Sequence, residues 1–282
     1  MPNGNSSAIQ SDLWYKALRF HFTEISSTNE AAMSWLRSSR PSQIAVFSAE
    51  HQTSGRGQHG RAWEHRADKD LAWSFAVHFE NPRNAREIDS AFWFRLNMEI
   101  SEAVKRFIEK SGGDDAPIQV GIKWPNDLYV RQTGSWKKCA GILLENHWKG
   151  QHLHGIVVGI GVNIAPFESA KDWAALQSFS HHKLRIATCQ NQLEQEFKTL
   201  FPLTTLDFDS ITPERFAAYQ KTLYGWNEVL SFEWKGAINK ARFLGVSDKG
   251  EAQLEWINGV HAGMTTSHFS AGDLRWMIPT EQ

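Results

Sequence analysis

The chain has 282 residues, of which 41% are hydrophobic and 22% charged, and 30 basic against 31 acidic side chains give a net charge of -1. This balance argues against a general nucleic-acid binder, which usually carries a strong basic excess. Two cysteines are too few for a disulfide framework, no stretch approaches the ~18 apolar residues that span a bilayer, and a signal-peptide pattern is lacking. We therefore expect a soluble cytoplasmic protein without a membrane partner.

The first ordered element is expected to be a helix that begins near Ser27. Ser27 and Glu30 fit a capping box, and apolar residues follow them at helical spacing. Pro41 is expected to end this helix, because proline cannot continue one.

Apolar periodicity predicts strands and helices over most of the chain that follows. Residues 71–79 alternate with a period of two, which is typical of a strand with one buried face, and residues 88–110 carry an apolar stripe at helical spacing. Gly134 and Gly150 mark hairpin turns between later strands. The expected strands are 43–48, 71–79, 118–122, 128–130, 139–146 and 154–164, and the expected helices are 88–110, 171–179, 190–200 and 212–224.

From Trp226 the pattern changes to short strands separated by turn residues, which predicts a small β-barrel or sandwich. We place the domain boundary near Gly225. The expected strands are 229–234, 240–244, 252–256 and a last one near 265–269.

A loop that is rich in glycine and arginine lies between the first two strands. The run from Gly55 to Gly60 matches G-x-G-x-x-G, but the residues after it carry no apolar helical stripe, so a Rossmann dinucleotide site is rejected. Glycine amides together with Arg56 and Arg61 are suited to phosphate or carboxylate, whereas a solvated turn with incidental charge is the alternative. Trp63 could stack on an adenine or pack as an ordinary aromatic residue.

Further polar residues follow along the chain. Lys123, Asn126 and Asp127 end a strand and could serve a phosphate and a magnesium ion, although Asp127 alone would most often be a turn residue. Lys138 would project a flexible cation from a strand edge, or be an ordinary surface lysine. The run from Gly159 to Asn163 is a strand of small residues that would leave room for a ligand.

Together these segments resemble the biotin protein ligase family in their residues, their order and their approximate spacing. The resemblance covers residues 20–165 closely, and the C-terminal part in architecture and position only. The matching residues are Ser27, Thr28, Asn29, Gln52, Gly55, Arg56, Gly57, Gly60, Arg61, Trp63, Lys123, Trp124, Pro125, Asn126, Asp127, Lys138, Ala140, Gly141, Ile142, Gly159, Gly161 and Asn163.

The resemblance implies an α+β fold, in which helices flank a central mixed β-sheet of the class II synthetase type and a small SH3-like β-barrel follows. It implies a flexible N-terminus at 1–19, a ligase domain at 20–225 and a small β domain at 226–282. Biotin and ATP would react to biotinyl-5′-AMP with Mg²⁺ present, and a lysine of a biotin carboxyl carrier protein would accept the biotinyl group. A homodimer that pairs exposed sheet edges is left open.

The resemblance also implies roles for individual residues. Lys138 and Arg56 would stabilise the charge that develops between carboxylate and phosphate, where losing one donor typically costs ~10²–10³ in rate. Asp127 would act through the metal or through the incoming amine. The residues implied for biotin are Ser27, Thr28, Gln52, Gly55, Arg56, Gly141, Leu143 and Gly159, and those implied for ATP are Arg56, Gly57, Arg61, Trp63, Lys123, Asn126, Lys138 and Asn163.

Two departures from the family pattern carry expectations. Gln58 and His59 stand where the family often has a run of basic residues, so we expect this loop to hold the adenylate less tightly. Residues 1–19 are too few for the helix-turn-helix domain of some bacterial members, so we expect a ligase without DNA-binding repressor function.

Three other functions remain as alternatives. A lipoate or octanoate protein ligase or transferase would share the fold superfamily. A non-catalytic biotin or nucleotide sensor would tolerate the loss of Lys138, which this chain keeps. An RNA-binding C-terminal barrel is disfavoured, because Lys235, Lys240 and Arg242 do not make that part strongly basic overall.

Overall fold

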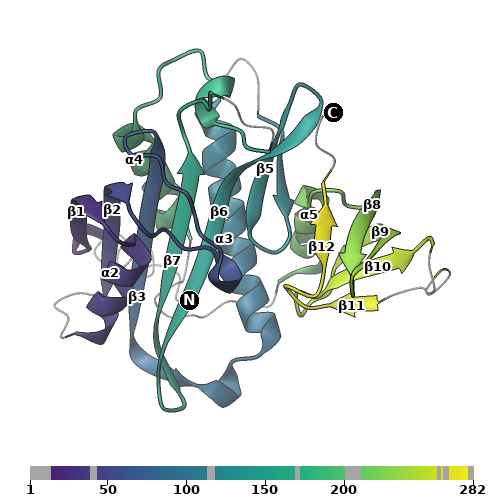
Figure 1. The fold of residues 1–282 in the computed structure, drawn as a ribbon. Helices are drawn as coiled ribbons and strands as arrows, with labels where there is room; N and C mark the ends of the chain where they lie inside the picture. The colour runs from purple at the N-terminus through teal and green to yellow at the C-terminus, as the bar shows by residue number, and fades with distance from the viewer. Residues whose placement is uncertain are drawn as a thin grey trace.

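A mixed sheet of seven strands forms the centre of the larger part of the chain (Figure 1). The computed structural model describes residues 14–38, 43–112, 118–168, 172–200, 211–258, 262 and 267–278. The strands are β1 (Leu18–Ile25), β2 (Ile44–Gln52), β3 (Asp70–Asn84), β4 (Val120–Lys123), β5 (Asp127–Gln132), β6 (Ser135–Lys149) and β7 (His152–Asn163). Their order is β1-β2-β3-β7-β6-β5-β4, in which β1 and β2 run parallel and the other neighbours pair antiparallel.

Helices cover both faces of this sheet, which confirms the predicted arrangement. The helix α2 (Thr28–Arg37) packs on one face, while α3 (Ser90–Ser111) and α4 (Ile186–Lys198) pack on the other (Figure 1). Strand β3 is therefore buried on both faces, and the expectation of one solvated face was wrong. Trp73 and Phe75 join the large core cluster of α3 and α4, whereas Ala76 joins the small cluster beneath α2. Within the described residues, none of the helices combines the length and apolar character needed to cross a membrane.

The start of α2 differs in detail from the expected capping box. Ser27 is the N-cap residue with an extended backbone, but its side chain makes no capping hydrogen bond. Instead, the hydroxyl of Ser26 donates to Glu30 Oε2 at 2.8 Å. The capping-box prediction is wrong because Glu30 bonds the side chain of Ser26, four residues before it, and Ser27 makes no side-chain capping bond. Pro41 lies outside the described residues.

Residues 171–179 were expected to form a helix, and this was wrong. The described part holds only a 3-10 turn, η3 (Leu176–Phe179), and the residues before it run alongside β6. The N–H of Lys138 donates to the carbonyl of Asp172, and the N–H of Ala174 donates to the carbonyl of Lys138. This pairing requires an extended backbone. It also places Lys138 between two backbone neighbours, so that it does not stand at a strand edge as expected.

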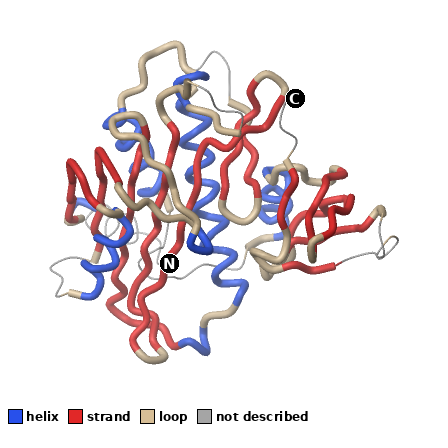
Figure 2. The backbone as a smooth tube through the Cα atoms, in the orientation of Figure 1, coloured by secondary structure: helices blue, strands red, loops and turns tan. Residues whose placement is uncertain are grey.

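A second sheet of five strands follows the helix α5 (Pro213–Thr222) and is set apart from the first sheet (Figure 2). Its strands are β8 (Val229–Trp234), β9 (Ala237–Val246), β10 (Ala252–Trp256), β11 (Ser267–Phe269) and β12 (Arg275–Met277), in the order β11-β10-β9-β8-β12. In the part of the chain that the structure describes, β11 and β12 do not pair with each other, so the sheet is open where a closed barrel was expected. Residues 265–266 of the expected last strand lie outside the described residues.

Three sets of contacts attach the second sheet to the larger part of the chain, two of them through α5 and the residues just after it. Trp124 Nε1 donates to the carbonyl of Gly250 at 3.0 Å. The amide of Gln220 bonds both the carbonyl and the N–H of Val246, at 2.6 and 3.0 Å. The N–H of Tyr224 donates to the carbonyl of Ile122 at 2.9 Å. Because Trp124 and Ile122 belong to β4 and the turn after it, the small sheet lies beside that turn.

Candidate active site

A cavity of about 670 Å³ opens between the Gly/Arg loop (residues 54–63), strands β6 and β7, the turn between β4 and β5, and the second sheet. Most of the residues singled out from the sequence line it. They are Ser27, Thr28, Gln52, Arg56, Gly57, Arg61, Trp63, Lys123, Asn126, Asp127, Lys138, Gly141, Leu143 and Gly159. Segments that lie far apart in the sequence therefore meet in one cavity.

Gly55 and Asn163 lie beside this cavity and do not line it. A Cβ on Gly55 would lie 2.4 Å from the carbonyl oxygen of Trp63, so Gly55 allows the two ends of the loop to come close together. Asn163 is 2% exposed, and its Nδ2 donates to the carbonyl of Lys138 at 3.3 Å. Both residues thus support neighbours that line the cavity.

The Gly/Arg loop folds back on itself as a tight hairpin. The N–H of Trp63 donates to the carbonyl of Gly55 at 2.9 Å, and the N–H of Gly57 donates to that of Arg61 at 2.7 Å. At the tip, η1 (Gln58–Gly60) is a 3-10 turn in which His59 has a φ of 55°. No α-helix starts in the loop, which agrees with the rejection of a Rossmann site.

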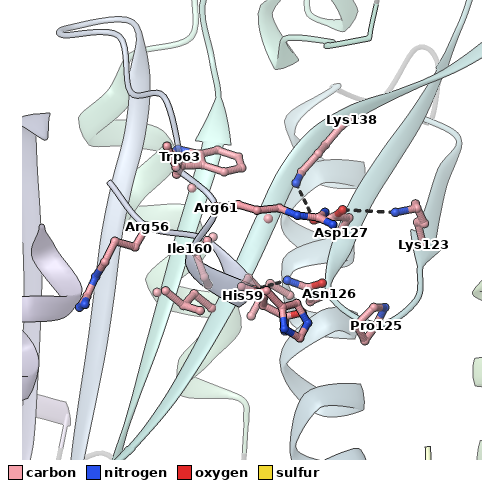
Figure 3. Close-up of a pocket in the computed structure, with 18 of the residues that line it drawn as sticks. Arg56, His59, Arg61, Trp63, Lys123, Pro125, Asn126, Asp127, Lys138 and Ile160 are labelled. Atoms are coloured by element: carbon pink, nitrogen blue, oxygen red, sulfur yellow. Dashed lines mark hydrogen bonds and ion pairs between the residues drawn. The ribbon is translucent and has the colours of Figure 1, made fainter. Parts of the chain in front are cut away.

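The centre of the cavity holds three cations and one carboxylate. Lys138 Nζ lies 2.6 Å from Asp127 Oδ1, and Lys123 Nζ lies 3.6 Å from Asp127 Oδ2, with the Arg61 side chain beside them (Figure 3). Burial lowers the pKa of Lys123; Asp127 opposes this shift, and Lys138 and Arg61 add to it. Among the described residues that line the cavity, Asp127 is the sole carboxylate. Such an excess of cations suits an anionic ligand.

Arg56 occupies a different position, at the rim. Its guanidinium lies 3.6 Å from a carboxylate oxygen of Glu30 and 3.5 Å from one of Glu145, and Figure 3 shows it pointing away from Lys138. These separations are long for an ion pair, and the side chain is 42% exposed. Little holds it there, so a rotation toward the cavity would cost little.

Polar groups that are satisfied by one another line the cavity beside α2. Gln52 Oε1 accepts from the N–H of Thr28 at 2.8 Å and from its hydroxyl at 2.9 Å. Asn29 donates to Glu145 Oε2 at 2.8 Å, and the hydroxyl of Ser74 donates to Asn29 Oδ1 at 2.6 Å. A buried network of this kind fixes side-chain positions and favours ligands with matching polar groups.

The glycines of β6 and β7 make room for protein side chains as well as for the cavity. A Cβ on Gly161 would lie 2.3 Å from the Trp63 ring, and one on Gly141 would lie 2.9 Å from it. A Cβ on Gly159 would lie 2.1 Å from Asn29 Oδ1. The expectation that these small residues leave space for a ligand is therefore incomplete, because Trp63 and Asn29 use part of that space.

Sequence reasoning missed several residues that line the cavity. Trp173 is 39% exposed and meets Trp63 edge-on, with ring centroids 6.1 Å apart, and Lys138 Nζ lies 5.2 Å from the Trp63 ring and 5.8 Å from the Trp173 ring. Arg275 and Trp276 of β12 contribute from the second sheet. Trp173 was hidden in the wrongly expected helix, and β12 was not predicted at all.

Comparisons with known proteins identify relatives of this chain. A bifunctional ligase/repressor BirA from Bacillus spizizenii is 29% identical over 140 residues, which cover 50% of this chain and 38% of that protein. A biotin--[acetyl-CoA-carboxylase] ligase from Mycobacterium tuberculosis is 31% identical over 154 residues, which cover 53% and 51%. This chain thus spans about half or less of the length of these relatives.

Solved structures share the fold. A biotin protein ligase from Aquifex aeolicus, in complex with biotin and ATP, superposes with a TM-score of 0.62 at 21% identity, over 93% of this chain and 99% of that one. The model of the biotin/lipoate A/B protein ligase family matches residues 21–163, which is half of the 282 residues. The matched range includes all of the site-forming segments up to β7. The chain therefore belongs to the biotin/lipoate A/B protein ligase family.

Proposed function

We propose that this protein activates biotin with ATP as biotinyl-5′-AMP and transfers the biotinyl group to a lysine of a biotin carboxyl carrier protein. One observation carries the proposal: a single cavity joins the cationic cluster of Lys138, Lys123 and Arg61 to the polar network of Thr28 and Gln52. The first suits a carboxylate and a phosphate, and the second suits a polar ring. Relatives named as biotin ligases support biotin over lipoate.

In the first step, a carboxylate oxygen of biotin attacks the α-phosphorus of ATP, and pyrophosphate leaves with the electron pair of the broken P–O bond. Negative charge gathers on the phosphate oxygens in the transition state. The Nζ of Lys138 and the guanidinium of Arg61 face the cavity, and Arg56 can turn into it from the rim. Cations that are in place before the reaction lower its barrier most.

The biotin end and the nucleotide end of the adenylate would be bound by different sets of residues that line the cavity. At the biotin end, Ser27, Thr28 and Gln52 would bond the ureido ring, and Gly141, Leu143 and Gly159 would line its path. At the nucleotide end, Trp63 would stack on the adenine with Trp173 beside it, because both rings line the cavity close to Lys138. Gly57, Lys123 and Asn126 would lie along the phosphates. Gly55 and Asn163 would act by holding the loop and the backbone of Lys138.

In the second step, the neutral amine of a carrier lysine attacks the acyl carbon of the mixed anhydride. A C–N bond forms, the C–O bond to phosphate breaks, AMP leaves, and the amine loses a proton. Lys138 would stabilise the oxyanion. Asp127 is placed to accept a hydrogen bond from the incoming amine, since it is the carboxylate nearest to Lys138 Nζ.

Magnesium has limited support from the protein itself. The described residues hold no group of three or more His, Cys, Asp or Glu that could bind a metal ion. Asp127 is the one carboxylate among the described residues that line the cavity, and it is engaged by Lys138 and Lys123. Magnesium commonly binds one or two carboxylates together with substrate phosphates. We therefore propose that magnesium would enter with ATP and that Asp127 would be its acidic contact on the protein.

A transfer assay tests the proposal. The protein is incubated with ATP, magnesium, labelled biotin and a biotin carboxyl carrier domain, and a parallel reaction contains labelled lipoate with its own carrier domain. We expect label on the biotin carrier only. Transfer of lipoate without transfer of biotin would replace the proposal by the lipoate alternative, and binding of biotin without transfer would favour a sensor.

A further inference from the structure

His65 ties together the two ends of the Gly/Arg loop. Its ring is buried, with 7% of the residue exposed. The N–H of Gln52, at the end of β2, donates to His65 Nδ1 at 3.2 Å. On the other side, His65 Nε2 lies 3.1 Å from the carbonyl oxygen of Asp70, at the start of β3. The ring therefore bridges the strands that enter and leave the loop.

These two partners determine the protonation of the ring. A backbone N–H can only donate and a backbone carbonyl can only accept, so Nδ1 must present its lone pair and Nε2 must carry the hydrogen. The bridge exists only with neutral His65. A second proton would be added at Nδ1, where it would face the N–H of Gln52 and remove that hydrogen bond.

The far side of the bridge is firmly fixed. Asp70 is 1% exposed, and its carboxylate accepts from the backbone N–H of Arg66 at 3.0 Å, from Arg66 Nε at 2.9 Å and from the N–H of Ile164 at 3.3 Å. The Arg66 guanidinium also donates to the carbonyl of Ala165 at 2.7 Å. Because Asp70 is held rigidly, a change in the protonation of His65 should alter the hydrogen bond to Gln52 and not the position of Asp70.

We propose that His65 is a positioning residue that holds Gln52 in place for the polar end of the substrate, and that protonation of its ring loosens this hold. The inference rests on the proposed function, because Gln52 also accepts both hydrogen bonds from Thr28 that shape the polar end of the cavity. Lys138 and Asp127 are held by each other, and the bridge joins His65 to other partners, so we expect the chemical step to be unchanged. Affinity for biotin then falls as the pH falls, while kcat stays constant.

The charges around the ring agree with a neutral histidine near neutral pH. Burial lowers the pKa of His65 from its ordinary value; Asp70 of β3 opposes this shift, while His51 of β2 and Arg66, which precedes β3, add to it. The ring of His51 stacks 6.4 Å away, and its Nδ1 lies 3.0 Å from Glu24 Oε2 of β1. Since the pKa is lowered, the bridge is intact at neutral pH and is lost as the pH falls through the shifted value.

The test measures biotin binding by calorimetry, and KM and kcat for biotin, from about pH 8 to about pH 5. We expect affinity to fall about tenfold in wild type at the acid end, as one lost hydrogen bond to a binding residue allows. His65→Asn offers an acceptor that does not titrate, so it should keep most of the neutral affinity with a flat pH profile. His152→Asn, at an exposed position of β7 outside the cavity, is the matched control and should keep the wild-type profile.

A second readout does not depend on the substrate. The ¹⁵N shifts of the His65 ring should show hydrogen on Nε2 alone at neutral pH. The protection factor of the Gln52 amide, which is the intrinsic exchange rate at each pH divided by the observed rate, should fall with acid. A profile that is the same in wild type and His65→Asn, or hydrogen on Nδ1, overturns the inference and leaves the proposed function intact. Absence of biotin binding at every pH overturns the proposed function instead.

Discussion

The indole of Trp63 packs directly on Gly161 of β7, which has no side chain. A methyl group on Gly161 would lie 2.3 Å from Trp63 Cε2, so the indole of Gly161→Ala must move. We expect KM for ATP to rise about tenfold and KM for biotin to change little, because a displaced binding group close to the chemistry is costly. Steady-state kinetics with each substrate varied checks this. Trp63→Ala should raise KM for ATP to a similar extent. In a double-mutant cycle, Gly161→Ala should then cause no further rise in KM for ATP when Trp63 is already replaced by Ala. An unchanged KM for ATP in both variants would contradict the stacking role.

Gln58 lines the cavity at the tip of the loop, where a cation would face the phosphates. Gln58→Arg adds a forked donor there. We expect it to release biotinyl-5′-AMP about tenfold more slowly than wild type, which a chase of labelled adenylate with unlabelled biotin measures. Gln195→Arg, which adds the same single charge at an exposed position of α4 outside the cavity, is the control. Equal release from Gln58→Arg and wild type would sink the idea of a weak grip.

Side chains within contiguous motifs could be predicted from the sequence, and those that arrive from elsewhere could not. Lys123, Asn126 and Asp127 follow one strand in a short run, so their proximity needs only local structure. Trp173 and Trp276 reach the cavity through pairing of distant backbone segments, which no local pattern encodes. The positions of Gly55 and Asn163 behind the cavity likewise depend on hydrogen bonds formed in the folded chain.

A buried ion pair between Asp70 and Arg66 lies at the start of β3, and hydrogen bonds join it to the residues just after β7. Asp70 is 1% exposed and accepts from both Arg66 and the N–H of Ile164. Removing one partner of a buried pair leaves the other charge uncompensated, so Asp70→Ala should lower the free energy of unfolding by about 3 kcal/mol. Urea denaturation measures this. The exposed control Glu64→Ala should change it by less than about 0.5 kcal/mol, and an equally small change for Asp70→Ala would contradict the anchoring role.

The strands of this chain were easier to predict from the sequence than the helices that cover the faces of the sheet. The periodicity of 71–79 identified β3, but a second layer of helix buries the face that was expected to be solvated. Strand β1 was missed although Leu18, Phe20 and Phe22 alternate with polar residues, because it is a half-exposed edge strand with a weak apolar signal. In 171–179, pairing with Lys138 overrides the local helical pattern.

The second sheet closes one side of the cavity, so its docking matters for the nucleotide. Gln220 makes two hydrogen bonds to Val246, and Gln220→Ala leaves both backbone groups without that partner. We expect the free energy of unfolding to fall by about 2 kcal/mol. Hydrogen exchange in β9 should speed up, and kcat/KM for ATP should fall several-fold, since Arg275 and Trp276 come from this sheet. Gln195→Ala on the exposed face of α4 should change none of these three quantities. Normal exchange and kinetics in Gln220→Ala would show that the contact is dispensable.

The arrangement of the two sheets could be anticipated from family resemblance and not from periodicity. Local patterns predict strands but not that β3 pairs with β7, some eighty residues along the chain. The same holds for the second sheet, in which β11 and β12 do not pair with each other within the described residues. The hairpin turns could be predicted from Gly134 and Gly150, because their φ values of 93° and 59° are ones that glycine adopts readily.

Biotin-dependent exchange of labelled pyrophosphate into ATP tests most directly whether this cavity forms an acyl adenylate. The account predicts exchange with biotin and not with lipoate, and a loss of about a hundredfold or more in Lys138→Ala, which removes the cation nearest to the reacting oxygens. Lys137→Ala, the neighbour on β6 outside the cavity, should exchange at the wild-type rate. Exchange that requires lipoate, or that proceeds at the wild-type rate in Lys138→Ala, would contradict the account.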